Sequence, residues 1–136
     1  MRKGLLIVSF LLALPGFAAE REVYRDSSGR RQATEVTQGS RTTYRDAKGR
    51  VSHTARKQGN VTRYYDASGR MAGRASEHGS KTTYRDASGR ITGTATVHGN
   101  LTIYRDASGR KTGSSSCNGN TTIYRDARGR ITGTKK

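Results

Sequence analysis

The sequence has no tryptophan, one proline and one cysteine, and acidic residues are scarce. The single Cys117 excludes an intrachain disulfide framework. No apolar run is long enough to cross a membrane as a helix, which takes about 20 residues. Against 26 Lys and Arg there are only 10 Asp and Glu, so the formal net charge is +16. A chain this basic favours anionic partners.

Motifs of catalysis and cofactor binding are missing as well. The sequence contains no Ser/His/Asp arrangement, no phosphate loop and no cofactor fingerprint. The histidines, His53, His78 and His98, are scattered, whereas a zinc site takes three or four ligands. We therefore expect no enzymatic activity, no cofactor and no metal. Cys117 takes the place that Val97 has one repeat earlier, which favours a small buried side chain.

What the sequence does contain is a repeat of twenty residues. The segment Tyr-Arg-Asp-Ala-Ser-Gly-Arg, or a close variant, occurs six times in phase. Repeats of this kind stack as units that bury their surface against their neighbours. The structural positions of the repeat are the tyrosines Tyr24, Tyr44, Tyr64, Tyr84, Tyr104 and Tyr124 and the glycines Gly29, Gly49, Gly69, Gly89, Gly109 and Gly129. Function is then expected on a repeated surface rather than in one pocket.

The first eighteen residues lie outside the repeat and have the pattern of a signal peptide. Arg2 and Lys3 are followed by an apolar run over 5–14 and by small residues up to Ala18. Ten apolar residues are too few to span about 30 Å of hydrocarbon. We expect cleavage after Ala18, export by a Sec-type route and a periplasmic or extracellular protein. The remaining residues, 19–136, form one domain of six repeats.

Each repeat predicts two short strands separated by two kinds of turn. In the fourth repeat, 81–85 is rich in Thr and Tyr and 91–97 alternates between apolar and polar residues. Asp86-Ala87-Ser88-Gly89 suits a turn that begins with Asp and ends with Gly, and Gly99-Asn100 suits a two-residue hairpin loop. The fold class is therefore all-β: an antiparallel meander of twelve strands, as a single-layer sheet or a curled or spiral one. Its terminal strands would leave open edges, with the charged residues of both chain ends acting as caps.

The register of these strands predicts which side chains are buried together. A two-residue Gly99-Asn100 loop pairs His98 with Leu101 and Ala95 with Tyr104. Successive tyrosines share a face only if the Asp86 turn also encloses an even number of residues. That solution gathers Tyr84, Ile91, Gly93, Ala95, Val97 and Thr102 on one buried face.

The opposite face is then predicted to carry two rows of arginine. They are the candidate polyanion-binding residues Arg25, Arg45, Arg85, Arg105 and Arg125, and Arg30, Arg50, Arg70, Arg90, Arg110 and Arg130. The arginine side chain donates two parallel hydrogen bonds to a carboxylate, phosphate or sulfate group. The other interpretation of these rows is a solvated face that keeps the protein soluble.

The third repeat resembles a known family. Tyr64-Tyr65-Asp66-Ala67-Ser68-Gly69-Arg70, followed by Gly79, Thr82 and Tyr84, is similar to the YD repeat of Rhs and teneurin proteins, and the similarity covers essentially all six units. The other five copies have arginine directly before the Asp, where the family favours tyrosine. The resemblance implies a spiralling antiparallel sheet, which in that family encloses a toxin or builds an extracellular shell. Six repeats are expected to be too few to enclose anything, so the resemblance concerns the local fold.

Three functions agree with these features. The first is a secreted, non-enzymatic surface or matrix binding module whose arginine face contacts lipopolysaccharide, acidic polysaccharide or DNA. The second is a self-assembling fibre subunit like curlin, in which homo-oligomers form through sheet edges. The third is a secreted inhibitor or immunity-type protein that binds an acidic protein. Stacked arginines would repel one another in a fibre, which favours the first over the second.

Overall fold

The protein is an all-β domain in the computed structural model, which describes residues 20–136. The twelve strands are β1 (Glu20–Asp26), β2 (Arg31–Gln38), β3 (Arg41–Asp46), β4 (Val51–Gln58), β5 (Val61–Asp66), β6 (Met71–His78), β7 (Lys81–Asp86), β8 (Ile91–His98), β9 (Leu101–Asp106), β10 (Lys111–Asn118), β11 (Thr121–Asp126) and β12 (Ile131–Lys135). The predicted antiparallel meander of twelve strands is thus confirmed. The predicted signal peptide lies outside the described residues.

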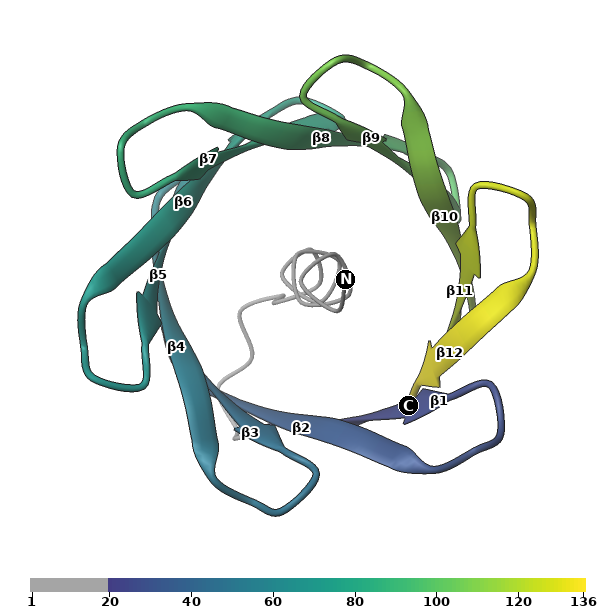
Figure 1. Cartoon of the computed structure of the whole chain (residues 1–136), viewed down its shortest axis with the longest axis horizontal. Coiled ribbons are helices and arrows are strands. Elements are labelled where there is room, and N and C mark those ends of the chain that lie inside the picture. The colour runs from purple at the N-terminus through teal and green to yellow at the C-terminus, as the bar shows by residue number, and fades with distance from the viewer. Residues whose placement is uncertain (1–19) are drawn as a thin grey trace.

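The sheet closes on itself into a barrel (Figure 1). Strands β1 and β12 pair antiparallel, with Tyr24 opposite Lys135 and Asp26 opposite Gly133. The sheet is a single curled layer, but the prediction that it leaves two open, capped edges was wrong, and so was the expectation that six repeats enclose nothing. Full closure pairs the backbone groups that two free edges would leave unsatisfied.

Regular β-bulges accompany the curvature that closure needs. The register shifts once in each of the six hairpins built on an Asp turn, directly after the tyrosine. In the β7–β8 hairpin, Tyr84 lies opposite Gly93 while Arg85 lies opposite Ile91, so Thr92 is the additional residue. A bulge bends its strand and increases the local twist. One bend in every repeat curves the sheet evenly around the ring.

The Asp turn differs from the prediction, yet the tyrosines still share a face. Three residues lie between Asp86 and Arg90, and Gly89 has a φ of 91°. A three-residue loop alone would send successive tyrosines to alternate faces. The bulge at Thr92 adds one further residue, so the number enclosed between Tyr84 and its partner Gly93 is even again. The expected even number of loop residues was wrong, but the turn from Asp86 to Gly89 is confirmed, since the Gly89 N–H donates to the Asp86 carbonyl oxygen at 3.1 Å. The shared tyrosine face is also present.

Because of the bulge, Ile91 lies on the opposite face of the sheet from the one predicted. We expected this side chain on the tyrosine face, but it lies opposite Arg85 and is 44% exposed. Val51, Met71 and Ile131 occupy the same position in other repeats and are similarly exposed.

The glycine turns follow the prediction. His98 pairs with Leu101 and Ala95 with Tyr104 across the two-residue loop. Gly99 has a φ of 60°, and no residue other than glycine has a positive φ among residues 20–136. Positive φ at the first loop position alone is the mark of a type II′ turn, whose twist matches that of the flanking strands.

The inner face of the barrel is a belt of tyrosine rings packed against small residues. Tyr84 lies between Ala75 of β6 and Gly93 of β8 and is 4% exposed. The same pattern gives the core cluster Tyr44, Ala55, Tyr64, Ala75, Tyr84, Ala95 and Tyr104. The predicted packing of large rings over glycine and alanine is confirmed.

The seam between the first and last strands replaces these small residues with charged ones. Lys135 stands where other repeats have Ala55, Ala75 or Ala95, and it is 3% exposed. Its Nζ pairs with Glu22 Oε2 and lies 3.9 Å from Glu35 Oε1, and Tyr24 donates a 2.7 Å hydrogen bond to Glu35. The charged ends that we interpreted as caps are therefore partners of one another.

We predict that Lys135→Ala destabilises the protein by about 3 kcal/mol, because it removes one partner of a buried ion pair and leaves the Glu22 carboxylate without its cation. Urea unfolding followed by circular dichroism measures the change. The exposed neighbour provides the control, since Lys136→Ala should leave the midpoint almost unchanged. Equal effects of the two substitutions would show that the charge cluster does not hold the seam.

Candidate functional site

The first arginine row lies on the outer face of the barrel and holds the Asp turns. In these residues Nη1 donates a hydrogen bond to the carbonyl oxygen of the glycine four positions later. The pairs are Arg25 with Gly29 at 3.0 Å, Arg45 with Gly49 at 3.0 Å, Arg85 with Gly89 at 3.0 Å, Arg105 with Gly109 at 3.1 Å and Arg125 with Gly129 at 3.4 Å. This contact uses one of the five N–H donors of a guanidinium. The row therefore combines a structural contact with an outward charge.

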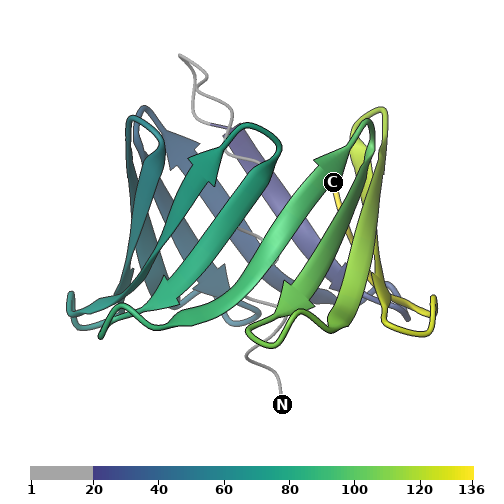
Figure 2. The ribbon, with the colours of Figure 1, turned by 90° about the horizontal axis from the view of Figure 1, so that it is seen from above.

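The second arginine row lies in the turns rather than on the strands. We predicted both rows on the strand face, but Arg30 and its equivalents directly follow the turn glycine in the sequence. The hairpin turns lie at the two ends of the barrel (Figure 2). All six are exposed: Arg30, Arg50, Arg70, Arg90, Arg110 and Arg130. Arg50 Nε lies 3.2 Å from Asp46 Oδ2, and Arg130 Nε lies 3.7 Å from Asp126 Oδ2. This row forms a basic rim around the turn end.

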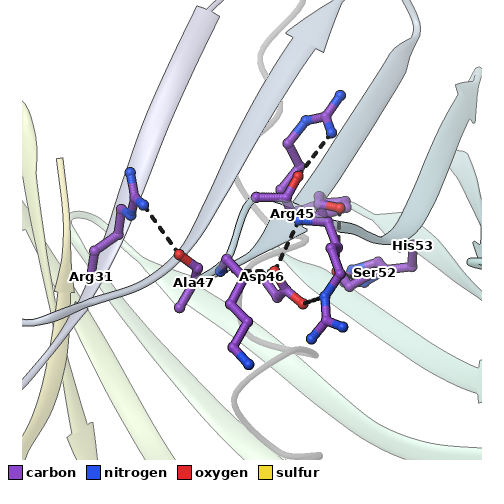
Figure 3. Close-up of polar contacts among 10 residues, drawn as sticks. Arg31, Arg45, Asp46, Ala47, Ser52 and His53 are labelled. Carbon is purple, nitrogen blue, oxygen red and sulfur yellow. Dashed lines mark hydrogen bonds and ion pairs between the residues drawn. The ribbon is translucent and has the colours of Figure 1, made fainter.

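The Asp carboxylates organise these turns. Asp46 Oδ1 accepts hydrogen bonds from the backbone N–H groups of Lys48, at 2.9 Å, and Arg50, at 3.0 Å (Figure 3). A link to the preceding repeat lies beside this turn, where Arg31 Nη2 donates to the Ala47 carbonyl oxygen at 3.1 Å. Hydrogen bonds to the ionised form hold the pKa of Asp46 below its usual value, with the Arg50 N–H as the largest cause. These contacts suit a turn carboxylate and not a general acid.

We predict that the turn carboxylates make the protein acid-sensitive. In Asp86 the Ser88 hydroxyl is the largest cause of a pKa below the ordinary 3.8, followed by the Arg90 N–H. Because the folded pKa is lowered, this stabilisation is present above 3.8 and is lost as the pH falls through the folded value. Asp86→Asn should lower the melting temperature at neutral pH, and the difference from the parent should shrink at about pH 2. A difference that is constant with pH would contradict this assignment.

The seam contains the one carboxyl group with a strongly raised pKa among residues 20–136. Burial raises the pKa of Glu35 to about 8, and the hydrogen bond to Glu22 acts in the same direction. Lys135 and the Tyr24 hydroxyl oppose this shift. Burial is the largest single influence on the pKa of Glu22 and acts to raise it, but the hydrogen bonds from Glu35 and Lys135 and the charge of Lys135 together outweigh burial and lower the pKa. The cluster is thus a Glu22–Lys135 ion pair beside Glu35, whose protonated form is favoured by burial.

We predict that the seam weakens as the pH rises. A carboxyl group whose folded pKa is raised stabilises the fold below its unfolded pKa of about 4.5, and this is lost as the pH rises through about 8. Burial lowers the pKa of His53 to about 4, which acts in the opposite direction between about 4 and 6.5. The melting temperature should therefore fall between about pH 6.5 and 8, and Glu35→Gln should flatten that slope. An unchanged slope in this variant would show that Glu35 is not its source.

The barrel interior holds a cavity that the sequence did not predict. Its volume is about 350 Å³, and aromatic and glycine residues line much of it: Tyr24, Tyr84, Tyr104, Tyr124, Gly93, Gly113 and Gly133. The Tyr104 hydroxyl lies 2.9 Å from Ser115 Oγ, and burial raises the pKa of Tyr104 to about 12. Neutral phenols of this kind offer hydrogen bonds and apolar surface and no acid or base near neutral pH. Closure creates this space, so no local signal in the sequence could have revealed it.

The histidine and cysteine side chains do not form a metal site in the described part of the chain. No group of three or more His, Cys, Asp or Glu residues among 20–136 could hold a metal ion. His53 stacks on the Tyr44 ring at a centroid distance of 4.2 Å. Cys117 pairs with Thr122 as Val97 pairs with Thr102, so the two positions are equivalent as predicted. Cys117 is nevertheless exposed, and the prediction of a buried thiol was wrong.

No protein-family model matches this chain, and no curated protein is significantly similar to it. Within residues 20–136 no helix is long and apolar enough to span a membrane.

Proposed function

We propose that this protein is a non-enzymatic, exported binding module of the YD-repeat type that contacts polyanions through its outer arginines. One observation carries the proposal: the repeat points its tyrosines into the barrel and presents arginines outside, on the wall and at the turn rim. Because the sheet is closed, the charge surrounds the molecule. A long anionic polymer could then bind along the wall or the rim through several guanidinium groups at once.

The charge balance supports this function over a merely solvated surface. Three carboxylates of the described chain, Glu22, Glu35 and Glu77, lie on the inner face or in the seam, and the Asp residues are bonded within their own turns. Few acidic groups are therefore left to neutralise the outer arginines. Such a field attracts polyanions and releases their counterions on binding.

Lipopolysaccharide, acidic polysaccharide and DNA remain the candidate ligands, and a periplasmic or extracellular location would bring the protein to them. An acidic protein partner, as in an inhibitor or immunity-type role, would use the same face. It would be distinguished by a complex of fixed stoichiometry with one protein.

The curlin-like alternative fits the closed barrel less well. A fibre that grows by strand addition needs a free edge, and here β1 and β12 pair with each other. Fibre growth would require the seam to open first. Sedimentation over a range of concentrations, together with thioflavin fluorescence, separates a discrete particle from a growing fibre.

We predict that the protein binds dextran sulfate but not uncharged dextran, which has the same sugar backbone. If at least four ionic contacts form, affinity should fall by about 100-fold or more between 50 and 200 mM salt. Isothermal titration calorimetry at several salt concentrations measures this dependence. Binding that is absent at low salt, or that ignores salt, would overturn the proposal.

A further inference from the structure

Five arginines stand directly opposite one another across neighbouring strands. The register pairs Arg41 with Arg56, Arg56 with Arg63, Arg63 with Arg74, and Arg74 with Arg85. The arginine ladder formed by these five residues crosses β3, β4, β5, β6 and β7, with one residue on each strand. Only Arg85 belongs to the periodic rows. The other four occur where the repeats depart from their common pattern.

The whole ladder lies on the outer wall of the barrel. Each member has a residue of the buried inner face next to it in sequence, such as Ala55 beside Arg56 and Tyr64 beside Arg63. Side chains alternate between the faces of a strand, so the arginines point outward. Four of them are exposed and Arg85 is half-buried. With strands about 4.8 Å apart, the ladder is a continuous line of positive charge.

The described chain supplies no counter-charge to this line. None of the five arginines forms an ion pair within residues 20–136. Arg63 donates to the neutral Gln58 amide oxygen at 3.2 Å, and Arg85 donates to the Gly89 carbonyl. The nearby Glu77 shares the inner-face register of Thr82 and pairs with Lys57.

The rest of the barrel has like-charged pairs but no such run of them. Arg25 lies opposite Arg31 and Arg105 lies opposite Lys111, and each pair stops at two residues. Arg125 lies between Ser114 and Ile131. Like charges directly opposite each other destabilise a sheet. The ladder is therefore a local cost to the fold that a bound row of anions would remove.

We propose that the arginine ladder is the binding site for one linear acidic polysaccharide, with carboxylate or sulfate groups spaced along its chain. The proposal rests on the polyanion-binding function proposed above and gives it a place and a ligand class. Each guanidinium can donate two parallel hydrogen bonds to one anionic group. The line runs across the strands, so a single extended polymer can contact all five.

The shape and composition of the wall favour a polysaccharide over a nucleic acid. Sites for single-stranded nucleic acid interleave basic and aromatic side chains. Tyr65 is the only tyrosine on the outer wall of the described chain, because the six repeat tyrosines point inward. Duplex DNA is read by a helix or a ribbon that enters a groove. The outside of a closed barrel is a broad convex surface instead (Figure 1).

The test compares two triple variants of equal charge. R56Q/R63Q/R74Q removes the centre of the ladder, and R70Q/R90Q/R110Q removes three exposed arginines of the turn rim. Heparin affinity is measured for both and for the parent protein over a range of salt concentrations. We expect the ladder variant to bind at least about 30-fold more weakly and its salt slope to fall by about 2 to 3, whereas the rim variant should lose about 10-fold less affinity than the ladder variant does.

The outcomes separate the two proposals. If the parent binds heparin and both variants lose the same affinity, the ladder is overturned and the general polyanion function stands. If the parent does not bind, the polyanion function fails and the ladder with it. Tighter binding of a single-stranded oligonucleotide than of heparin at the ladder would overturn the assignment to a polysaccharide.

Folding is checked in the same experiment. Because R56Q/R63Q/R74Q relieves repulsion between opposite arginines, its melting temperature should equal or exceed that of the parent. R56K/R63K/R74K keeps the charge and removes the forked donors, and its affinity should fall between those of the parent and the glutamine variant. Parent-like affinity in the lysine variant would show that charge alone suffices and would remove the role of the forked geometry.

Discussion

The structure depends on one constraint: after twenty residues, each tyrosine must return to the same face of the sheet. Two features of opposite effect meet this constraint in every repeat. The three-residue Asp turn alone would send the next tyrosine to the other face of the sheet. The bulge after the tyrosine adds one residue and returns the next tyrosine to the same face. The bulge also bends the sheet. The residue that keeps the rings together is therefore part of the reason that the sheet can curve into a ring.

Closure depends on a second, non-periodic feature. The terminal repeats bring Lys135, Glu22 and Glu35 into the inner layer, where the central repeats have alanine or threonine at most of these positions. A buried charge is costly unless its partner is present, and here the partners come from opposite ends of the chain. The ion pair thus favours pairing of the first and last strands over pairing of either with another molecule. The same chemistry makes the seam sensitive to a rise in pH, whereas the Asp turns are sensitive to a fall.

The one distinct region of the outer surface is formed by residues that depart from the repeat pattern. The periodic arginines hold turns or form the rim, and their positions are the same in nearly every unit. The ladder appears only in repeats two to four, where Arg41, Arg56, Arg63 and Arg74 depart from the common pattern. A nearly uniform ring therefore has one side that differs from the rest.

Local chemistry allowed much of the fold to be predicted from the sequence. The period identified the six units, Asp and Gly identified the turns, and the Gly99-Asn100 loop determined the pairing of Ala95 with Tyr104. These are relations between residues close in sequence, where turn geometry sets the register. The bulge at Thr92 carries no distinctive residue type, and for that reason the exposure of Ile91 was not predicted.

The sequence by itself determined the strands, most of the turns and the separation of tyrosine from arginine, because each follows from alternation and turn chemistry within one repeat. Only the tertiary structure decided that the sheet closes, that Lys135 is buried beside Glu22, and that arginines from five strands form one line. Each of these outcomes depends on bends added over the whole chain and on pairing between strands, which no single repeat contains.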